Sequence, residues 1–307
     1  MVLVVVLSGA RSLADLPPFT FSRVFTAWSV DPVLTVLSVW VVGAYLFGAW
    51  VLRDRGVQWP LGRTLSFLCG MAFFVFATSS GLGTYDTALL SVHMVQHMVL
   101  SMVVPLFLAL GAPVTLMLRT LPRRPRAVLL AMLHSRAAKV LSFPPLTFLL
   151  FVISPWALYF TSWYDASLRS VLVHETMHVH LVLVGSLFFW PLVGADPVPG
   201  RVQFPFRLLL VILTLPFHAF LGVTIMGQDQ LIAGDWYRAL PMSWLPSPAA
   251  DQHVAGGILW ASGDAVGLVF LAVLFTQWVR SSTREAVRED RRLDRLEAQS
   301  DRREASR

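Results

Sequence analysis

Seven long apolar stretches dominate the sequence and decide what kind of fold it can adopt. A helix needs about 20 mostly apolar residues to cross the hydrocarbon core of a bilayer, and each stretch reaches that length. Only 14% of the 307 residues are charged, whereas soluble globular proteins carry about 25%. We therefore predict an all-α, polytopic membrane protein with seven transmembrane helices. The stretches cover approximately residues 33–52, 65–85, 89–117, 144–163, 169–193, 208–227 and 254–279.

The basic residues are unevenly divided between the segments that alternate along these stretches. Of the 24 Arg and Lys residues, 20 fall in residues 53–64, 118–143, 194–207 and from 280 onward. Because cytoplasmic loops carry an excess of Arg and Lys, we expect the N-terminus outside and the C-terminus in the cytoplasm, across a bacterial inner membrane. The net charge of +6 then reflects Arg beside the cytoplasmic leaflet, and we expect no nucleic-acid partner. The lipid bilayer is the surrounding solvent.

This topology predicts three regions. They are an extracytoplasmic arm (1–32), the transmembrane domain (33–279) and a charged cytoplasmic tail (280–307). Residues 126–141 mix apolar and basic positions at helical spacing, which is typical of an interfacial helix. The tail alternates Arg with Asp and Glu, which predicts either a solvated helix or disorder.

Seven of the eight histidines fall in or near the outer half of the predicted membrane domain; His134 alone falls on the cytoplasmic side. Ionisable side chains inside spans are energetically costly and by default indicate a functional site. His93 and His97 are four residues apart, so they lie on one helix face, and His174 and His178 repeat this spacing. Two such pairs on facing helices can converge on one ion or bracket two.

Donors of other kinds lie close to these histidines. Met94 adjoins the first pair, and imidazole with thioether suits copper, particularly Cu(I). The competing explanations are hydrogen bonding between helices for the histidines and apolar packing for the methionines. Asp264 lies inside the last stretch, where it can orient an imidazole or serve helix packing. The candidate metal ligands are His93, His97, His174, His178, His218, His253, Met94, Asp251 and Asp264.

Cys69 is the only cysteine, so the chain can form no internal disulfide and no Cys-x-x-Cys metal site.

Three blocks of this sequence resemble the CtaG-type assembly factors of caa-type cytochrome c oxidases. They are HMVQHMVLSMVVPLFLALGAPVTLMLR (93–119), MHVHLVLVGSLFFWPLVGADP (177–197) and DQHVAGGILWASGD (251–264). The resemblance implies a non-enzymatic role in maturing a haem–copper oxidase, with copper delivery as the expected chemistry. It also implies oxidase subunits, and an extracytoplasmic copper chaperone, as partners. The positions that match the family pattern are His93, His97, His178, Asp251 and Asp264; His174, His218 and His253 follow from depth and spacing instead.

The hypothesis that results is a copper carrier. Cu(I) arrives from the outer side, enters a site between the third, fifth and sixth spans, and passes to an oxidase subunit by ligand exchange. Two alternatives remain. Residues 174–178 read HETMH, an H-E-x-x-H motif typical of zinc metalloproteases. Histidines at equal depth on different spans can also ligate haem axially, which would make the chain a membrane electron carrier.

Overall fold

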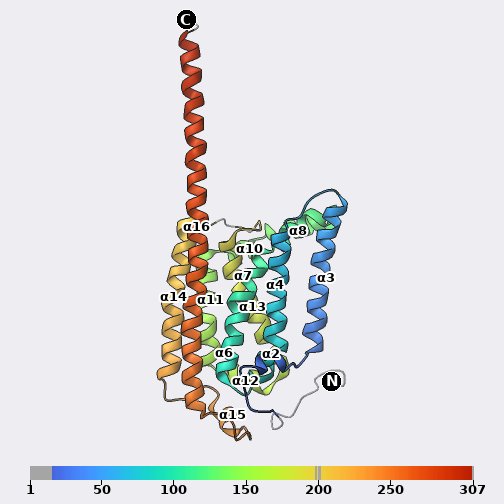
Figure 1. Ribbon diagram of the computed structural model, residues 1–307, viewed down its shortest axis with the longest axis vertical. Helices are drawn as coiled ribbons and strands as arrows, with labels where there is room; N and C mark the ends of the chain where they lie inside the picture. The colour runs from blue at the N-terminus through green and yellow to red at the C-terminus, as the bar shows by residue number, and fades with distance from the viewer. Residues whose placement is uncertain (1–15, 198, 200–201, 306–307) are drawn as a thin grey trace.

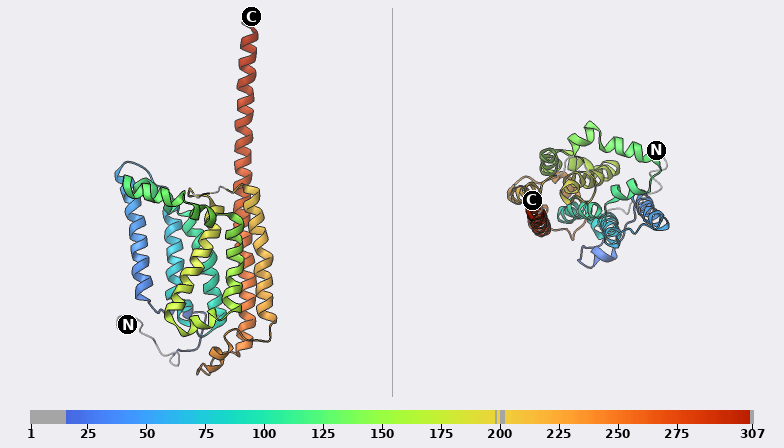
Figure 2. Two further views of the ribbon diagram at one scale, coloured as in Figure 1. Left: turned by 180° about the vertical axis from the view of Figure 1, so that it is seen from behind. Right: turned by 90° about the horizontal axis from the view of Figure 1, so that it is seen from above.

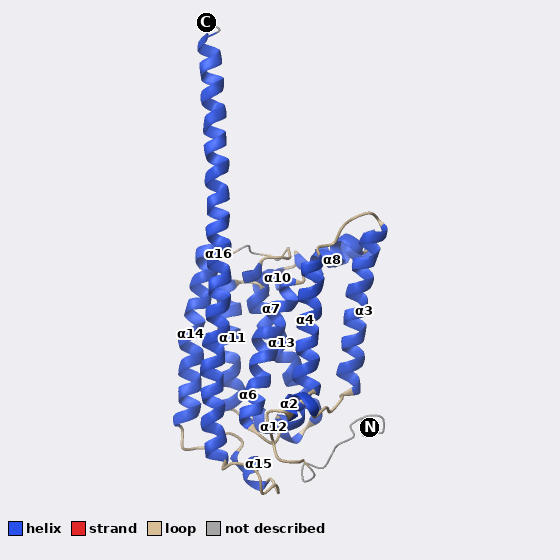
Figure 3. Ribbon diagram, viewed as in Figure 1, coloured by secondary structure: helices blue, strands red, loops and turns tan. Residues whose placement is uncertain are grey.

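The computed structural model describes residues 16–197, 199 and 202–305, so most of the first half of the predicted N-terminal arm lies outside the described residues. All regular structure in these residues is helical (Figure 3). The principal helices are α3 (Pro32–Asp54), α4 (Leu61–Ser79), α6 (Leu90–Met98), α7 (Val104–Leu110), α11 (Pro144–Phe160), α13 (Val171–Val193), α14 (Phe204–Gly227) and α16 (Pro248–Ala305). The shorter ones are α2 (Arg23–Thr26), α5 (Gly81–Tyr85), α8 (Pro113–Thr120), α9 (Arg123–Leu133), α10 (Arg136–Leu141), α12 (Trp163–Arg169), α15 (Gly234–Ala239) and the π-helix η2 (Val99–Val103).

The long helices stand side by side as a bundle (Figure 1, Figure 2). Among the described residues, six helical spans are long and apolar enough to cross a membrane, and the bent pair α11–α12 supplies a seventh. The prediction of an all-α polytopic membrane protein is therefore confirmed. Each predicted apolar stretch corresponds to one of these spans.

The fourth span ends at a bend that the sequence pattern did not reveal. α11 has 17 residues, and α12 follows it at an angle of 64°. Thr161 between them is extended, with φ −120° and ψ −179°. Its hydroxyl donates to the carbonyl of Ala157, the acceptor that its own backbone N–H would use in a continued helix. The bend lays α12 across one end of the bundle.

The third span is continuous but irregular, because Pro105 has no N–H to donate to the carbonyl of Ser101. The π-helix η2 lies just before this proline. Gly185 of α13 packs directly against the irregular segment, where an added Cβ would lie 2.0 Å from the Ser101 carbonyl oxygen. The absence of a side chain at Gly185 therefore allows α13 to approach η2 and α7 closely.

Close backbone contact also joins α14 to α16. A Cβ added at Gly222 would lie 2.6 Å from the Gly256 carbonyl oxygen, and one added at Gly256 would lie 2.5 Å from that of Gly222. Small residues that let backbones approach are typical of helix pairs in membranes. This contact fixes α14 and its histidine against the last helix.

The two ends of the bundle differ (Figure 1). We call one the α15 end; it carries α2, α5, α12 and α15. The other, the tail end, carries α8, α9 and α10, and α16 projects beyond it as one unbroken helix of 58 residues. The described part of the tail is thus helical, and no break marks residue 280.

The predicted interfacial helix over residues 126–141 is two helices. α9 ends at Leu133, and the hydroxyl of Ser135 accepts a hydrogen bond from the Ala138 N–H at 3.1 Å to begin α10. A serine at an N-cap favours a new helix start over continuation of the old helix. Neither α9 nor α10 buries a residue in the bundle.

Candidate metal centre

Three metal-ligand side chains meet at the α15 end. Asp86 comes from the turn after α5, and His174 and His178 come from the first two turns of α13. Their ligand atoms all lie within 4.8 Å of one another. Asp86 Oδ2 is 2.9 Å from His174 Nε2 and 3.9 Å from His178 Nε2. Two imidazole nitrogens and a carboxylate oxygen directed at one point can bind a transition-metal ion.

Local structure explains why these groups converge. The spacing of four puts both imidazoles on one face of α13, with ring centroids 4.5 Å apart. On the opposite side, the N–H groups of Ala88 and Leu89 both bond to the carbonyl of Tyr85, which makes a tight turn around Asp86. The carboxylate is thereby presented to α13 from a fixed backbone.

The imidazole of His178 is held on both sides. Its Nε2 lies 3.2 Å from Gln96 Oε1, and Gln96 donates its own amide N–H to the carbonyl of Ala77 at 3.0 Å. That second bond turns Oε1 of Gln96 toward the histidine, and since an amide oxygen only accepts, His178 Nε2 donates to it. A metal ion bound at this nitrogen would take the place of that proton. On the far side of the ring, His178 Nδ1 lies 3.4 Å from Glu175 Oε2. A carboxylate beside the distal nitrogen is a common partner of a metal-bound histidine, because it fixes the ring orientation.

Asp86 supplies negative charge to this site. Its burial alone would raise its pKa, but the charge and hydrogen bond of His174, with His178 and His93 nearby, bring the pKa below its ordinary value. The carboxyl group is therefore ionised. A cation placed between the two imidazoles would find a full opposite charge beside it.

The predicted pair His93 and His97 does not join this group of three. Both rings instead contact the hydroxyl of Tyr159 on α11, at 3.1 Å from His93 Nε2 and 2.8 Å from His97 Nδ1. All three side chains are buried. A tyrosine hydroxyl has one proton, so it donates to one ring and accepts from the other. The two histidine pairs therefore lie in different hydrogen-bonded clusters.

His97 and His218 line a small cavity deeper in the bundle. His218 is 6% exposed, and its Nδ1 lies 3.1 Å from the carbonyl oxygen of Thr214. Because a carbonyl can only accept, Nδ1 carries the proton and Nε2 keeps its lone pair. The space that the centre of a water molecule can occupy in this cavity is about 10 Å³. The cavity therefore holds about one water molecule. A haem cannot fit there, so this pair does not support the electron-carrier alternative.

The remaining predicted ligands are scattered. Met94 is completely buried in the main apolar core, and His253 is exposed on α16. Asp264 has one buried carboxylate oxygen, Oδ1, without a hydrogen-bond partner in the described part of the chain. The backbone beside it packs against the His218 ring, since a Cβ on Gly263 would lie 3.1 Å from that side chain. None of these three belongs to the Asp86–His174–His178 group.

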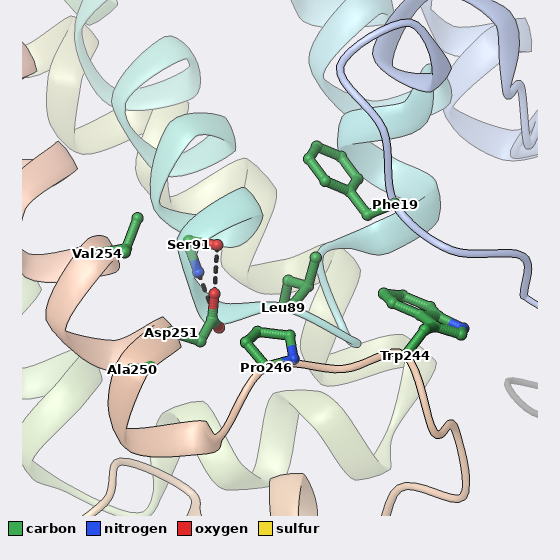
Figure 4. Close-up of a pocket in the computed structure, with 8 residues that line it drawn as sticks. All are labelled: Phe19, Leu89, Ser91, Trp244, Pro246, Ala250, Asp251 and Val254. Atoms are coloured by element: carbon green, nitrogen blue, oxygen red, sulfur yellow. Dashed lines mark hydrogen bonds between the residues drawn. The ribbon is translucent and has the colours of Figure 1, made fainter.

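Asp251 positions a helix. Its carboxylate accepts hydrogen bonds from the backbone N–H of Ser91, at 3.3 Å, and from the Ser91 hydroxyl (Figure 4). The local N-cap of α6, Leu89, offers no side-chain acceptor. Asp251 therefore caps α6 from the neighbouring α16, in the wall of a pocket that Phe19 and Trp244 also line (Figure 4). Asp251, predicted as a metal ligand, thus stabilises the start of α6.

The sequence interpretation missed Asp86 and Gln96. Asp86 falls between two predicted spans, so it is not one of the carboxylates inside spans that the sequence indicates. One signal was present, because Asp86 is the only acidic residue between Asp54 and Asp165. Gln96 stands between His93 and His97 in sequence, and its polar side chain within an apolar helix was a second signal.

Comparison with known proteins bears on this arrangement. The sequence model of the family described as cytochrome c oxidase caa3 assembly factor matches residues 43–281. The chain belongs to this family. It is 42% identical over 288 residues to an uncharacterized protein of Mycobacterium bovis, and 39% identical over 295 residues to one of Mycobacterium leprae. These alignments cover 91% and 94% of this chain but 44% and 45% of the relatives. The chain thus spans less than half the length of the curated relatives it matches, and no solved structure matches it.

The fold shows what holds the three resembling blocks of this assembly-factor family member together. Asp251 in the third block caps α6 in the first block. Asp196 in the second block accepts hydrogen bonds from the backbone N–H groups of Val114, at 3.1 Å, and Thr115, at 2.6 Å, and so caps α8. It also accepts from the indole N–H of Trp190 at 2.9 Å. Two carboxylates therefore tie both ends of the third span to other helices.

Proposed function

We propose that this chain assists the assembly of a cytochrome c oxidase by binding copper at the Asp86–His174–His178 site and delivering it from the outer side of the membrane. The observation that carries the proposal is the convergence of these three ligand groups in a member of the assembly-factor family. The two imidazoles supply nitrogen donors that suit copper. The ionised Asp86 offsets the charge of the ion.

The exposure of the site suits a carrier, which must both load and release its cargo. The side chain of His174 is 12% exposed, whereas those of Asp86 and His178 are 3% exposed. His174 is thus the donor that an incoming copper chaperone reaches first, and the donor from which a recipient can take the ion by ligand exchange. The distribution of basic residues supports an outward-facing α15 end. Copper would then reach an oxidase subunit within the same bilayer.

The test measures oxidase copper in the native host. Cells carrying Asp86→Ala or His174→Ala should assemble an oxidase with less copper per haem and slower oxygen consumption than wild-type cells. His253→Ala is the matched control, since His253 is an exposed histidine near the same end. Unchanged copper and respiration in the Asp86 and His174 variants, with the proteins present in the membrane, would contradict the proposal.

One observation favours a second candidate function, a zinc-dependent hydrolase. Asp86 adds a third ligand to the two histidines of the HETMH motif, and catalytic zinc sites use three protein ligands and an open position. The position of Glu175 argues against this function. Its Oε2 lies beside Nδ1 of His178, the ring nitrogen on the far side from Asp86, where it orients the ring.

Glu175→Gln separates the two functions. A zinc hydrolase would lose its general base and its peptidase activity with bound metal retained. A copper carrier should keep its copper and its effect on oxidase assembly. Zinc in the purified protein, together with peptide hydrolysis that this variant abolishes, would favour the enzyme.

A further inference from the structure

We propose that the cavity between α6, α11, α13 and α14 is a second copper position, at which Nε2 of His97 and Nε2 of His218 hold one Cu(I) ion. We call it the inner site. This inference rests on the proposed function, because it assumes the same cargo at the Asp86–His174–His178 site, which we call the outer site. The inner site gives the ion a place in the interior of the bundle.

The size of the cavity and the residues that line it suit a bound ion. The centre of a water molecule has about 10 Å³ of space in the cavity, which admits a single small ion or one water molecule. His97, His218, Ser101 and Ser154 give the wall polar groups within an otherwise apolar lining. Ser154 is held by the His180 ring, whose Nε2 lies 2.7 Å from the serine hydroxyl. These four polar residues can contact a polar occupant of so small a space.

In each of the two histidines, one ring nitrogen is hydrogen-bonded and the other is left for a ligand. His218 uses Nδ1 for the Thr214 carbonyl, and His97 uses Nδ1 for the Tyr159 hydroxyl. A hydrogen bond at one ring nitrogen is the usual means of presenting the other nitrogen to a metal. Two nitrogen donors suit Cu(I), which accepts low coordination numbers, better than ions that require four or six ligands.

Asp264 lies on α16 next to Gly263, which packs against the His218 ring. Its Oδ1 is buried without a hydrogen-bond partner in the described residues, and its carboxylate interacts electrostatically with His218. A cation inside a membrane domain is strongly disfavoured unless an opposite charge lies near it. Asp264 is not among the residues that line the cavity, so it would act on an ion there through space and not as a ligand.

Helix irregularities provide the space. Pro155 in α11 cannot donate to the carbonyl of Phe151, and Pro105 cannot donate to that of Ser101. Both Phe151 and Ser101 line the cavity. π-helical turns of the kind that precedes Pro105 occur frequently at functional sites.

Polar groups also connect the two sites. His93 interacts electrostatically with Asp86 at the outer site. Tyr159 then bridges His93 to His97, which lines the inner site. Hydrogen bonds therefore join His93 to the inner site, whereas the link from His93 to Asp86 is one of charge alone.

The experiment counts Cu(I) bound by the full chain in detergent, by competition with the chromophoric chelator bicinchoninate under reducing conditions. The wild-type protein should bind two equivalents. His97→Ala/His218→Ala should bind one, and His174→Ala/His178→Ala should also bind one. His134→Ala is the control, because His134 is an exposed histidine between α9 and α10, outside both sites, and it should retain two. Gel filtration and circular dichroism check that each variant is folded.

The outcomes separate the two proposals. Two equivalents in the His97/His218 double variant would overturn the inner site and leave the outer site intact. Two equivalents in the His174/His178 double variant would overturn the outer site. Should the double alanine variant not fold, His218→Asn provides the same test, since the asparagine amide nitrogen takes the position of Nδ1 and can still donate to the Thr214 carbonyl. Loss of one equivalent supports the inner site, and retention of both overturns it.

Discussion

Asp86 is the residue on which the outer site depends most. If this carboxylate were absent, no acidic group would lie between the Nε2 atoms of the two α13 histidines, because Glu175 contacts His178 at Nδ1 on the other side of the ring. Its 2.9 Å contact with His174 and its burial combine a hydrogen bond with an opposite charge in a water-poor place. Such interactions are stronger there than in water. The affinity for a cation should therefore depend on this single charge.

Asp86→Asn removes the charge and keeps the shape. We expect the affinity for copper to fall at least about tenfold, since changes to groups that merely contact metal ligands already reduce affinity by about 10–100-fold. Competition against a chromophoric chelator measures the change. Asp165→Asn is the matched control, because Asp165 is an aspartate outside the site that pairs with Arg169. Equal affinity in wild type and Asp86→Asn would show that Asp86 is no ligand.

The sequence predicts some of these residues and not others. The spacing of His174 and His178 fixes a common helix face, so their pairing could be inferred from helix geometry. The partnership with Asp86 could not, because it depends on a turn 88 residues away in sequence. The capping role of Asp251 could not be predicted for a similar reason. Its carboxylate satisfies the backbone of Ser91, 160 residues away, and nothing local distinguishes a cap of this kind from a ligand.

Other helices hold the third span in place, and with it the two histidines of its first turns. Asp251 supplies the hydrogen-bond acceptor that α6 lacks at its own start. Gly185 lets α13 lie against η2 and α7. The bend at Thr161 and the division between α9 and α10 are each accompanied by a side-chain hydrogen bond, which hydrophobic periodicity does not predict. Periodicity located the helices well and their interruptions poorly.

Asp251→Ala should destabilise the protein by removing the cap of α6. Loss of an N-cap costs about 0.5–2 kcal/mol, and burial of this one favours the upper part of that range. We expect a lower Tm in detergent for Asp251→Ala and little change for Asp251→Asn, which retains an acceptor. Asp229→Ala is the control, since Asp229 is exposed. An unaltered Tm in Asp251→Ala would show that the cap contributes little.

Gly185→Ala should disrupt the contact between α13 and the third span. The new Cβ would lie 2.0 Å from the Ser101 carbonyl oxygen and 2.7 Å from Pro105 Cγ, neither of which can move freely. Overpacking of this kind costs about 1–3 kcal/mol, and the same shift should weaken Cu(I) binding at the inner site. Gly43→Ala is the control, because nothing lies within 4 Å of its added Cβ. Equal thermal stability in both variants would contradict the close approach.

The molecule as a whole has two distinct ends, and the predicted orientation places the α15 end outside. Under the proposed function, this orientation decides from which side copper would arrive. The long helix α16 connects the two ends, since it begins beside the α15 end and projects past the tail end (Figure 1). The number of spans and their order could be read from apolar length alone, whereas the direction of the chain depends on the positions of Arg and Lys.

Cysteine labelling in intact cells tests this orientation. In a Cys69→Ser background, a membrane-impermeant maleimide should label Arg238→Cys at the α15 end and spare Ser282→Cys beyond the tail end. Both positions are exposed, so accessibility alone does not bias the comparison. After the cells are permeabilised, both variants should be labelled. The reverse pattern would place the outer site on the cytoplasmic side.

The most direct test of the central claim is an anomalous difference map from crystals of the copper-loaded protein, recorded on both sides of the copper absorption edge. The account predicts a copper peak between Asp86 Oδ2, His174 Nε2 and His178 Nε2, and its loss in His174→Ala/His178→Ala. A peak at the zinc edge at this position would favour the hydrolase instead. No metal peak at these three residues, in protein that holds copper elsewhere, would contradict the account.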